Sequence, residues 1–354
     1  YWGTHHERAY SLIQTSDGGY AMTGAAWRPS SSSWDYWLVK TDPYGSGGWT
    51  QEYDNAGLHD YALSAIQTSD GGYALTGYTR IGSGNYDFWL VKTDSSGNKE
   101  WSQTYGGGND DRASSVIQTL DGGYALGGYT RSYGAGGKDL WLVKTDLYGM
   151  EEWTQTYGGP YDEGETHDTE FYTVACTVVQ TVDGGYALAG PAKSYGPDSD
   201  FWLVKTNSTG NVEWNITHPI EGDDYAYSMV YTNDGRFAMA GYTAPPFPET
   251  DAEWEVLLVR SSTESGLVWT NITNSTITLR RGVTDIYWNN LRVRIWRIQE
   301  PTWMFGDINQ DGVVDAQDLL ILSQNYGSTL SLLSLTGIIG ILGVQTYKTR
   351  KRPK

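Results

Sequence analysis

An internal repeat of about fifty residues limits the fold of this chain more than any other feature of its sequence. One repeated string, Asp-Gly-Gly-Tyr, begins at Asp17, Asp70, Asp121 and Asp183, and a weaker copy begins at Asp234. A second, Trp-Leu-Val-Lys-Thr, begins at Trp37, Trp89, Trp141 and Trp202, and a weaker copy begins at Leu257. Because both strings recur in the same order, the chain contains five copies of one structural unit.

Each unit is predicted to form four short strands. In the third unit, apolar alternation and flanking turn residues predict strands at 113–119, 124–130, 140–145 and 152–157. Asp121-Gly122-Gly123 forms the first turn, since glycine tolerates positive φ. Four strands per fifty residues are typical of a β-propeller blade. We therefore expect an all-β fold, a β-propeller spanning residues 1–280 with five blades and room for a partial sixth.

The composition agrees with this fold and excludes several functions. Aromatic residues make up 14% of the chain, and we expect the repeated Trp and Tyr side chains to pack between blades. The formal net charge of -18 excludes nucleic-acid binding, because such a surface repels phosphates. The single cysteine, Cys176, excludes both a disulfide framework and a cysteine zinc site.

Acidic residues recur at two places in the repeat. Pairs that contain acids or histidine precede the first strand of most units, as at His59-Asp60 and Asp110-Asp111. They either form a ring that concentrates cations or cap their own turns, and the recurrence favours capping. Asp35, Asp87, Asp139 and Asp200 precede the third-strand Trp and are expected to brace the blade.

One irregularity breaks the regular spacing. About ten extra residues lie around 160–172 and include Asp162, Glu163, Glu165, His167, Asp168 and Glu170. This insertion is either a loop that binds a cation or ligand, or an acidic segment exposed to solvent, and the second interpretation is favoured.

Residues 281–304 follow the fifth unit and connect it to the C-terminal part of the chain. They contain a predicted hairpin with strands at 283–288 and 291–298. This hairpin starts a sixth blade, seals the ring or forms a stalk, and the sequence does not choose between them.

Residues 305–327 contain a predicted Ca²⁺ loop. Calcium requires six to eight oxygen ligands, which a twelve-residue loop can supply. The candidate ligands are Asp307, Asn309, Asp311, the Val313 carbonyl, Asp315 and Asp318. Gly312 stands where such a loop turns sharply, and residues 319–326 suit an exiting helix. The Gly-Asp-Ile-Asn-Gln-Asp-Gly opening and the final Asp318 resemble the calcium repeat of type I dockerin domains. Dockerins carry two such repeats and this sequence has one, which argues against cohesin binding and favours a calcium-stiffened joint.

A membrane anchor is predicted at residues 328–347. This stretch contains no charged residue, is rich in Leu and Ile, and is about 30 Å long as a helix. The basic residues 348–354 follow it and predict a cytoplasmic tail and an extracellular propeller. A cleaved sorting signal and a buried helix are the alternatives. Four Asn-x-Ser/Thr sequons, at Asn207, Asn215, Asn271 and Asn274, agree with an extracellular location.

These features together resemble prokaryotic cell-surface proteins, archaeal ones among them, with propeller repeats and a C-terminal membrane segment. The resemblance implies location and architecture more than activity. The near-identity of the repeats favours a non-catalytic module for adhesion, envelope structure, or carbohydrate or protein binding. The alternatives are a polysaccharide-active enzyme, which needs two carboxylates about 5–9.5 Å apart, and a dockerin-mediated component of a polysaccharide-degrading assembly.

Overall fold

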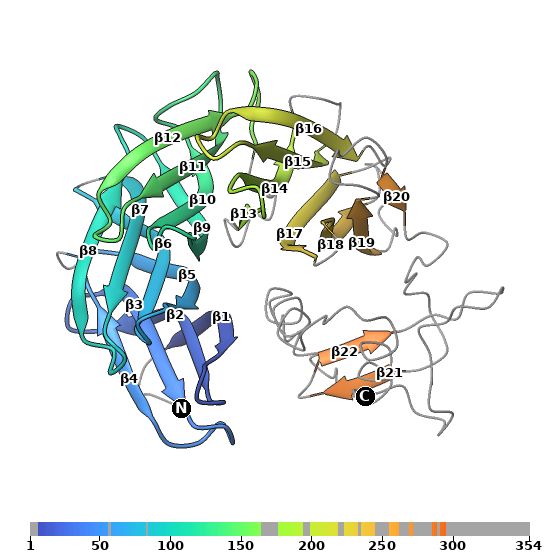
Figure 1. Ribbon diagram of the computed structural model, residues 1–354. Helices are drawn as coiled ribbons and strands as arrows, with labels where there is room; N and C mark the ends of the chain where they lie inside the picture. The colour runs from blue at the N-terminus through green and yellow to red at the C-terminus, as the bar shows by residue number, and fades with distance from the viewer. Residues whose placement is uncertain are drawn as a thin grey trace, which may run out of the picture.

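The computed structural model describes residues 6–55, 58–82, 84–163, 176–193, 199–218, 223–232, 235–244, 255–261, 269–271, 285–288 and 291–294. In this part of the chain, five sheets of four antiparallel strands each are formed, and in every sheet the strands pair in chain order. The sheets stand around an arc, with the first strand of each on the inner side and the fourth on the outer side (Figure 1). The expected fold of four-stranded propeller blades is therefore confirmed.

Each blade corresponds to one sequence repeat. Blade 1 contains β1 (Glu7–Gln14), β2 (Tyr20–Arg28), β3 (Ser33–Thr41) and β4 (Trp49–Tyr53). Blade 2 contains β5 (Asp60–Gln67), β6 (Tyr73–Ile81), β7 (Asn85–Thr93) and β8 (Lys99–Tyr105). Blade 3 contains β9 (Asp111–Gln118), β10 (Tyr124–Thr130), β11 (Asp139–Thr145) and β12 (Glu151–Tyr157). Blade 4 contains β13 (Thr177–Gln180), β14 (Tyr186–Ala192), β15 (Asp200–Thr206) and β16 (Val212–His218). Blade 5 contains β17 (Asp223–Tyr231), β18 (Phe237–Ala244), β19 (Glu255–Ser261) and β20 (Trp269–Asn271).

The two repeated strings interlock within a blade. In blade 3, Asp121 accepts hydrogen bonds from Thr119 Oγ1 and from Gly123 N, and its Oδ2 lies 2.9 Å from Lys144 Nζ. Lys144 also donates to Glu152 at 2.7 Å, and only 3% of its side chain is exposed. Its charge is thus buried among oxygen atoms. Each of the first four blades contains the same ion pair, which explains why the Asp and the Lys recur together.

Aromatic layers between neighbouring blades form much of the core. The ring centroids of Trp89 and Tyr36 lie 4.4 Å apart between blades 1 and 2. Those of Trp141 and Phe88 lie 4.6 Å apart between blades 2 and 3. Both tryptophans are almost completely buried. The prediction that the repeated Trp side chains fill the space between blades is therefore confirmed.

Tyrosine hydroxyls at the ends of the fourth strands link each of the first three blades to the next. They donate to glycine carbonyls in the following blade: Tyr53 to Gly97 at 2.7 Å, Tyr105 to Gly149 at 2.6 Å and Tyr157 to Gly210 at 2.8 Å. These bonds are buried, so the blades are joined by directional contacts as well as by apolar packing.

The C-terminal part of the chain is described only in a hairpin. β21 (Asp285–Trp288) pairs with β22 (Leu291–Arg294) in an antiparallel arrangement. The predicted Ca²⁺ loop at 305–327 and the predicted anchor at 328–347 lie outside the described residues. Where the structure describes the chain, it contains no helix long and apolar enough to cross a membrane.

Candidate functional site

One side of the propeller brings together polar side chains from neighbouring blades. On this side the first strands begin, the second strands end and the third strands begin, and we call it the entry face. The Asp-Gly-Gly-Tyr turns lie on the opposite side, which we call the turn face. On the entry face, the third strand of one blade meets the first strand of the next, so every interface between blades has an acidic edge.

The residue just before each first strand, or at its start, bonds to the preceding blade. The backbone N–H groups of Tyr86, Lys138 and Ser199 donate to Asp110, Asp162 and Asp223 at 3.1, 2.9 and 2.8 Å, respectively. His59 Nδ1 accepts the corresponding bond from Trp34 N at 3.2 Å. The prediction that these residues cap their own turns is wrong for this position, because they hold adjacent blades together.

The next residue does bond to its own entry loop, as predicted. Asp60 accepts hydrogen bonds from Asn55 N at 2.8 Å and from Thr79 Oγ1 at 2.5 Å. Asp111 accepts the corresponding bond from Gly107 N at 2.8 Å. Both carboxyl groups are completely buried. Burial raises the pKa of Asp60 to about 8, and its two hydrogen bonds oppose that rise only in part.

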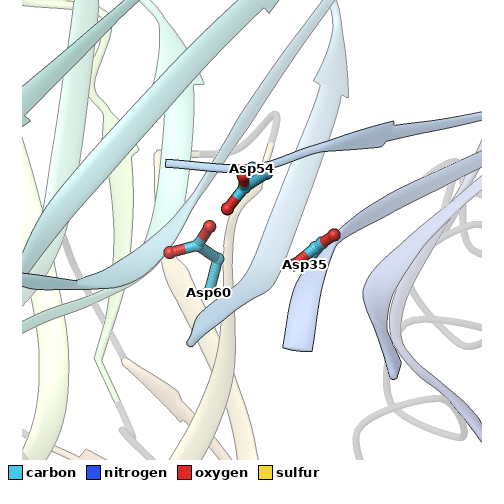
Figure 2. Close-up of side chains that lie close together, drawn as sticks. All are labelled: Asp35, Asp54 and Asp60. Carbon is cyan, nitrogen blue, oxygen red and sulfur yellow. The ribbon is translucent and has the colours of Figure 1, made fainter. Parts of the chain in front are cut away.

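A cluster of three carboxyl groups lies at the interface of blades 1 and 2. Asp35 comes from β3, Asp54 follows β4 and Asp60 begins β5 (Figure 2). One oxygen from each lies within 4.8 Å of the others. Asp35 and Asp60 are buried and Asp54 is exposed, so the cluster meets solvent on one side. Carboxylate oxygens are hard ligands, so this cluster could hold a metal ion, whose identity these residues alone do not fix.

The residue that follows the fourth strand explains why a third carboxyl group is present at this interface and not at the next two. Gly106 and Gly158 follow the fourth strands of blades 2 and 3, as Asp54 follows β4. A Cβ on Gly106 would lie 2.4 Å from the Asp87 carboxyl group, and one on Gly158 would lie 1.9 Å from Asp139 Oδ1. In these two interfaces the glycine backbone packs against the acidic pairs Asp87–Asp111 and Asp139–Glu163, which leaves no space for a third side chain.

The electrostatic environment of the cluster favours positive charge. Burial raises the pKa of Asp35, and the neighbouring Asp54 contributes to that rise. Burial likewise raises the pKa of Asp87 to about 6 at the next interface. Arg28 supplies the local counter-charge, because its Nε lies 3.7 Å from Asp35 and its guanidinium also pairs with Glu52. A bound cation would stabilise the ionised form of these carboxyl groups.

Aromatic rings continue from this cluster across the entry face of blades 1 and 2. The centroid distances are 5.6 Å for Trp27 and Trp34, 6.2 Å for Trp34 and Tyr61, 5.2 Å for Tyr61 and Tyr78, and 5.2 Å for Tyr78 and Tyr86. Arginines lie over three of these rings: Arg8 is 4.8 Å from the centroid of Trp34, and Arg112 is 4.9 Å from that of Tyr78 and 4.7 Å from that of Tyr86. We call these residues the aromatic strip.

The aromatic strip occupies positions that differ from repeat to repeat. The residue after the buried end of the second strand is Trp27, Arg80, Arg131 or Lys193, and its N–H makes the same inter-strand bond in all four blades. The residue whose N–H donates to the acidic or histidine acceptor of the next blade is Trp34, Tyr86, Lys138 or Ser199. The side chain therefore changes where the backbone geometry does not.

The structure tests only part of the predicted insertion. Glu163 is completely buried, pairs with Ala192 and donates its N–H to Lys138 O at 2.7 Å. Asp162 and Glu163 thus match Asp110 and Asp111 and belong to the propeller framework. The remaining residues of the insertion, 164–172, lie outside the described residues, as do all the predicted calcium ligands: Asp307, Asn309, Asp311, Val313, Asp315 and Asp318.

Sequence reasoning singled out Asp35 and Asp60 but did not combine them with Asp54. The missing signal was a comparison of the residues that follow the fourth strands, which are Asp54, Gly106 and Gly158. An acid in place of a glycine at that point marks the interface of blades 1 and 2 as different from the next two.

Comparisons with known proteins address the fold alone. No protein-family model matches the chain, and no curated protein sequence matches it. Similar solved structures include a protein of unknown function from Bacteroides caccae, with 9% identity, a TM-score of 0.46, and coverage of 76% of this chain and 83% of that one. The Neurospora crassa Pan2 WD40 domain has 9% identity, a TM-score of 0.47 and coverage of 75% and 65%. The β-propeller domain of the Trilobed protease from Pyrococcus furiosus has 11% identity, a TM-score of 0.39 and coverage of 76% and 71%. The described residues form five four-stranded antiparallel blades, so the chain is a β-propeller protein.

Proposed function

We propose that this protein is a non-catalytic binding module that recognises carbohydrate on the entry face of blades 1 and 2. The observation that carries the proposal is the contrast between constant and variable positions in the repeats. The framework strings are almost identical in four blades, whereas the entry-face positions change from Trp to Tyr, Arg, Lys or Ser. A chain that needed only a stable ring would not require large aromatic side chains at these partly exposed positions.

The chemistry of the aromatic strip suits a sugar chain. Aromatic rings provide flat apolar surfaces, and the nearby Asp and Arg side chains can accept from and donate to hydroxyl groups. Trp34 and Tyr61 are partly exposed, and Asp54 is exposed beside them. Asp54 presents an exposed carboxyl group beside these rings and the chain has a formal net charge of -18, so a neutral glycan fits better than an acidic one.

The arrangement of the three carboxyl groups supports binding more than hydrolysis. A glycosidase needs an acid and a second carboxylate that both reach the substrate. Asp60 is completely buried and bonds to Asn55 and Thr79, much as Asp111 bonds to its own loop and blade. A group used as a brace in two interfaces is poorly placed to protonate a glycosidic oxygen, which makes the polysaccharide-active enzyme the weaker candidate.

A glycan array probed with the full chain tests the proposal, with Trp34→Ser as the variant and Tyr44→Ser as the control. Ser is the residue that blade 4 has at the position of Trp34, and Tyr44 is a highly exposed residue on the turn face. We expect neutral glycans to bind and Trp34→Ser to weaken binding about tenfold, which corresponds to about 1.4 kcal/mol. Equal binding by both variants, or turnover of any bound glycan, would contradict the proposal.

The proposed location is the cell surface, with a C-terminal membrane anchor. It is supported by the uncharged stretch 328–347, the basic tail 348–354 and the four sequons. The proposed role of Ca²⁺ at Asp307 and Asp318 is to stiffen the joint between propeller and membrane, while a dockerin-like assembly role is the alternative. Membrane fractionation of cells that express the full chain, with and without residues 328–354, tests the anchor.

A further inference from the structure

A group of exposed apolar side chains lies on the turn face of blade 3, far along each strand from the aromatic strip. The exposed fractions are 82% for Leu120, 50% for Leu147, 64% for Tyr148 and 58% for Met150. They occupy two turns of one blade, the turn between β9 and β10 and the turn between β11 and β12. Exposed apolar groups on one face of a single blade can form a contact surface. We call these four residues the blade 3 patch.

The other repeats show that the turns do not require apolar side chains. In blade 3, Tyr148 N and Met150 N both donate to Asp146 Oδ1 at 2.8 Å. In blade 2, Ser96 N and Asn98 N donate to Asp94 Oδ1 at the same distances. The positions that correspond to Leu120 and Leu147 are Ser69 and Ser95 in blade 2. The turn geometry is the same, so the apolar residues of blade 3 serve some purpose other than folding the turn.

A pocket of about 450 Å³ adjoins the blade 3 patch at the interface with blade 2. Leu147 and Tyr148 form part of its lining, together with the rings of Trp101 and Tyr124. A pocket of this volume can accept one or two side chains of a partner. Its walls are therefore continuous with the exposed apolar surface.

The polar lining of the pocket is acidic. Lys92 lies among its lining residues, but its Nζ already contacts Asp70 at 2.8 Å, Glu100 at 2.9 Å and Thr93 O at 2.8 Å. The Asp70 and Glu100 side chains remain 58% and 47% exposed, so their oxygens can accept further hydrogen bonds. Two carboxylates and one ammonium leave one negative charge, in a chain whose formal net charge is -18.

We propose that the blade 3 patch and the adjoining pocket bind a partner protein through a segment that combines an apolar side chain with Arg or Lys. The apolar residue packs on Leu120, Leu147 and Met150, and the cation lies against Tyr148 and the carboxylates of the pocket. Exposed Leu and Met side chains favour a protein over a sugar chain, because they offer no hydrogen bonds and no flat ring. This site is separate from the entry face and does not depend on the proposed carbohydrate binding.

The test is fluorescence anisotropy of two labelled peptides mixed with the full chain, one of alternating Leu and Arg and one of alternating Leu and Glu. The patch variant combines Leu120→Ser, Leu147→Ser, Tyr148→Ser and Met150→Asn, which are the residues of blade 2. The control is Tyr44→Ser, which alters the position of Tyr148 in blade 1. Neither change alters the net charge, so general attraction between the acidic chain and a cation is the same in all three proteins.

We expect the Leu-Arg peptide to bind to the parent chain and to the control, and to bind at least tenfold more weakly to the patch variant. The Leu-Glu peptide should not bind. Circular dichroism and urea midpoints should be equal in the three proteins, since the changes are on exposed turns. Equal binding by parent and patch variant, binding of both peptides, or no binding of either would overturn the proposal. Self-association of the parent that the patch variant loses would also overturn it, because the occupant would then be a second copy of this chain.

Discussion

The two glycines of the Asp-Gly-Gly-Tyr turn should respond differently to the same substitution. Gly122 has φ of 86°, and a Cβ added to it would meet no atom within 4 Å. Gly123 has no such φ, but a Cβ added to it would lie 2.1 Å from Thr145 O and 2.9 Å from Lys144 Nζ. Gly122→Ala therefore introduces only backbone strain, whereas Gly123→Ala forces two neighbouring groups of β11 to move.

The contacts of each glycine set the expected loss of folding free energy. Alanine in the left-handed region costs about 1–2 kcal/mol, which is the expected effect of Gly122→Ala. At Gly123 the Thr145 carbonyl must move by nearly an ångström, and such overpacking costs about 1–3 kcal/mol. The same movement disturbs the pairing of Tyr124 with Thr145 and the contacts of Lys144, and a weakened hydrogen bond adds about 1 kcal/mol. The entropy change of the unfolded chain is the same in both variants and cancels in their difference.

Urea unfolding monitored by tryptophan fluorescence measures this difference. We expect Gly123→Ala to lower the free energy of unfolding by about 1 kcal/mol more than Gly122→Ala does. Gly72→Ala provides a second test in blade 2, because its Cβ would lie 2.1 Å from Thr93 O. If Gly122→Ala is the more destabilising change, the turn does not depend on close approach of the two strands, and the interlocking of the repeated strings is refuted.

Three further predictions concern pH, blade contacts and calcium. The pKa of Asp60 is about 8 in the folded chain, against an ordinary value of 3.8, so the folded state holds an extra proton between these values and its stability falls as pH rises through that range. Asp60→Asn should therefore make the urea midpoint fall less steeply with pH between about pH 5 and pH 8. An unchanged dependence of the midpoint on pH would contradict the shift. Tyr105→Phe removes the 2.6 Å bond to Gly149 O and should lower the free energy of unfolding by about 1 kcal/mol in the same urea assay, and no loss would show that the bond contributes nothing. Asp307→Asn with Asp318→Asn should abolish calcium heats in isothermal titration, and full retention of the heats would exclude the predicted loop as the site.

The repeating framework was predictable because its determinants are local or lie within one blade. The turn glycines, the apolar alternation and the third-strand Trp predict the four strands of a unit, and periodicity then predicts at least five blades. In the third unit, β10 (Tyr124–Thr130) has the predicted bounds, and β9 begins two residues before the predicted start. The difference arises because Asp111 is buried and bonded to Thr130, whereas an acid in a sequence suggests a loop.

The candidate site was less predictable because its contacts cross between blades. The bond from Tyr86 N to Asp110 joins residues 24 positions apart, and no local pattern indicates which atom an acidic side chain will meet. The cluster of Asp35, Asp54 and Asp60 also depends on three different strands or loops. In the sequence it differs from the next two interfaces at a single residue, Asp54, where those interfaces have glycine. That one residue decides whether the interface has space for a third carboxyl group.

The repeats supply their own controls for deciding which residues serve the fold. Blades 2 and 3 share the ion pair of the turn, the aromatic layer and the tyrosine link, so these contacts explain stability in both. They differ in the turn residues, where Ser96 in one blade corresponds to Tyr148 in the other, although the backbone bonds are the same. Since the fold accepts either residue, stability alone does not require an aromatic ring at this position. Blade 1 has Tyr44 there, so what sets blade 3 apart is that Tyr148 stands beside Leu147 and a pocket, and on the entry face Trp34 likewise stands where blade 4 has Ser199.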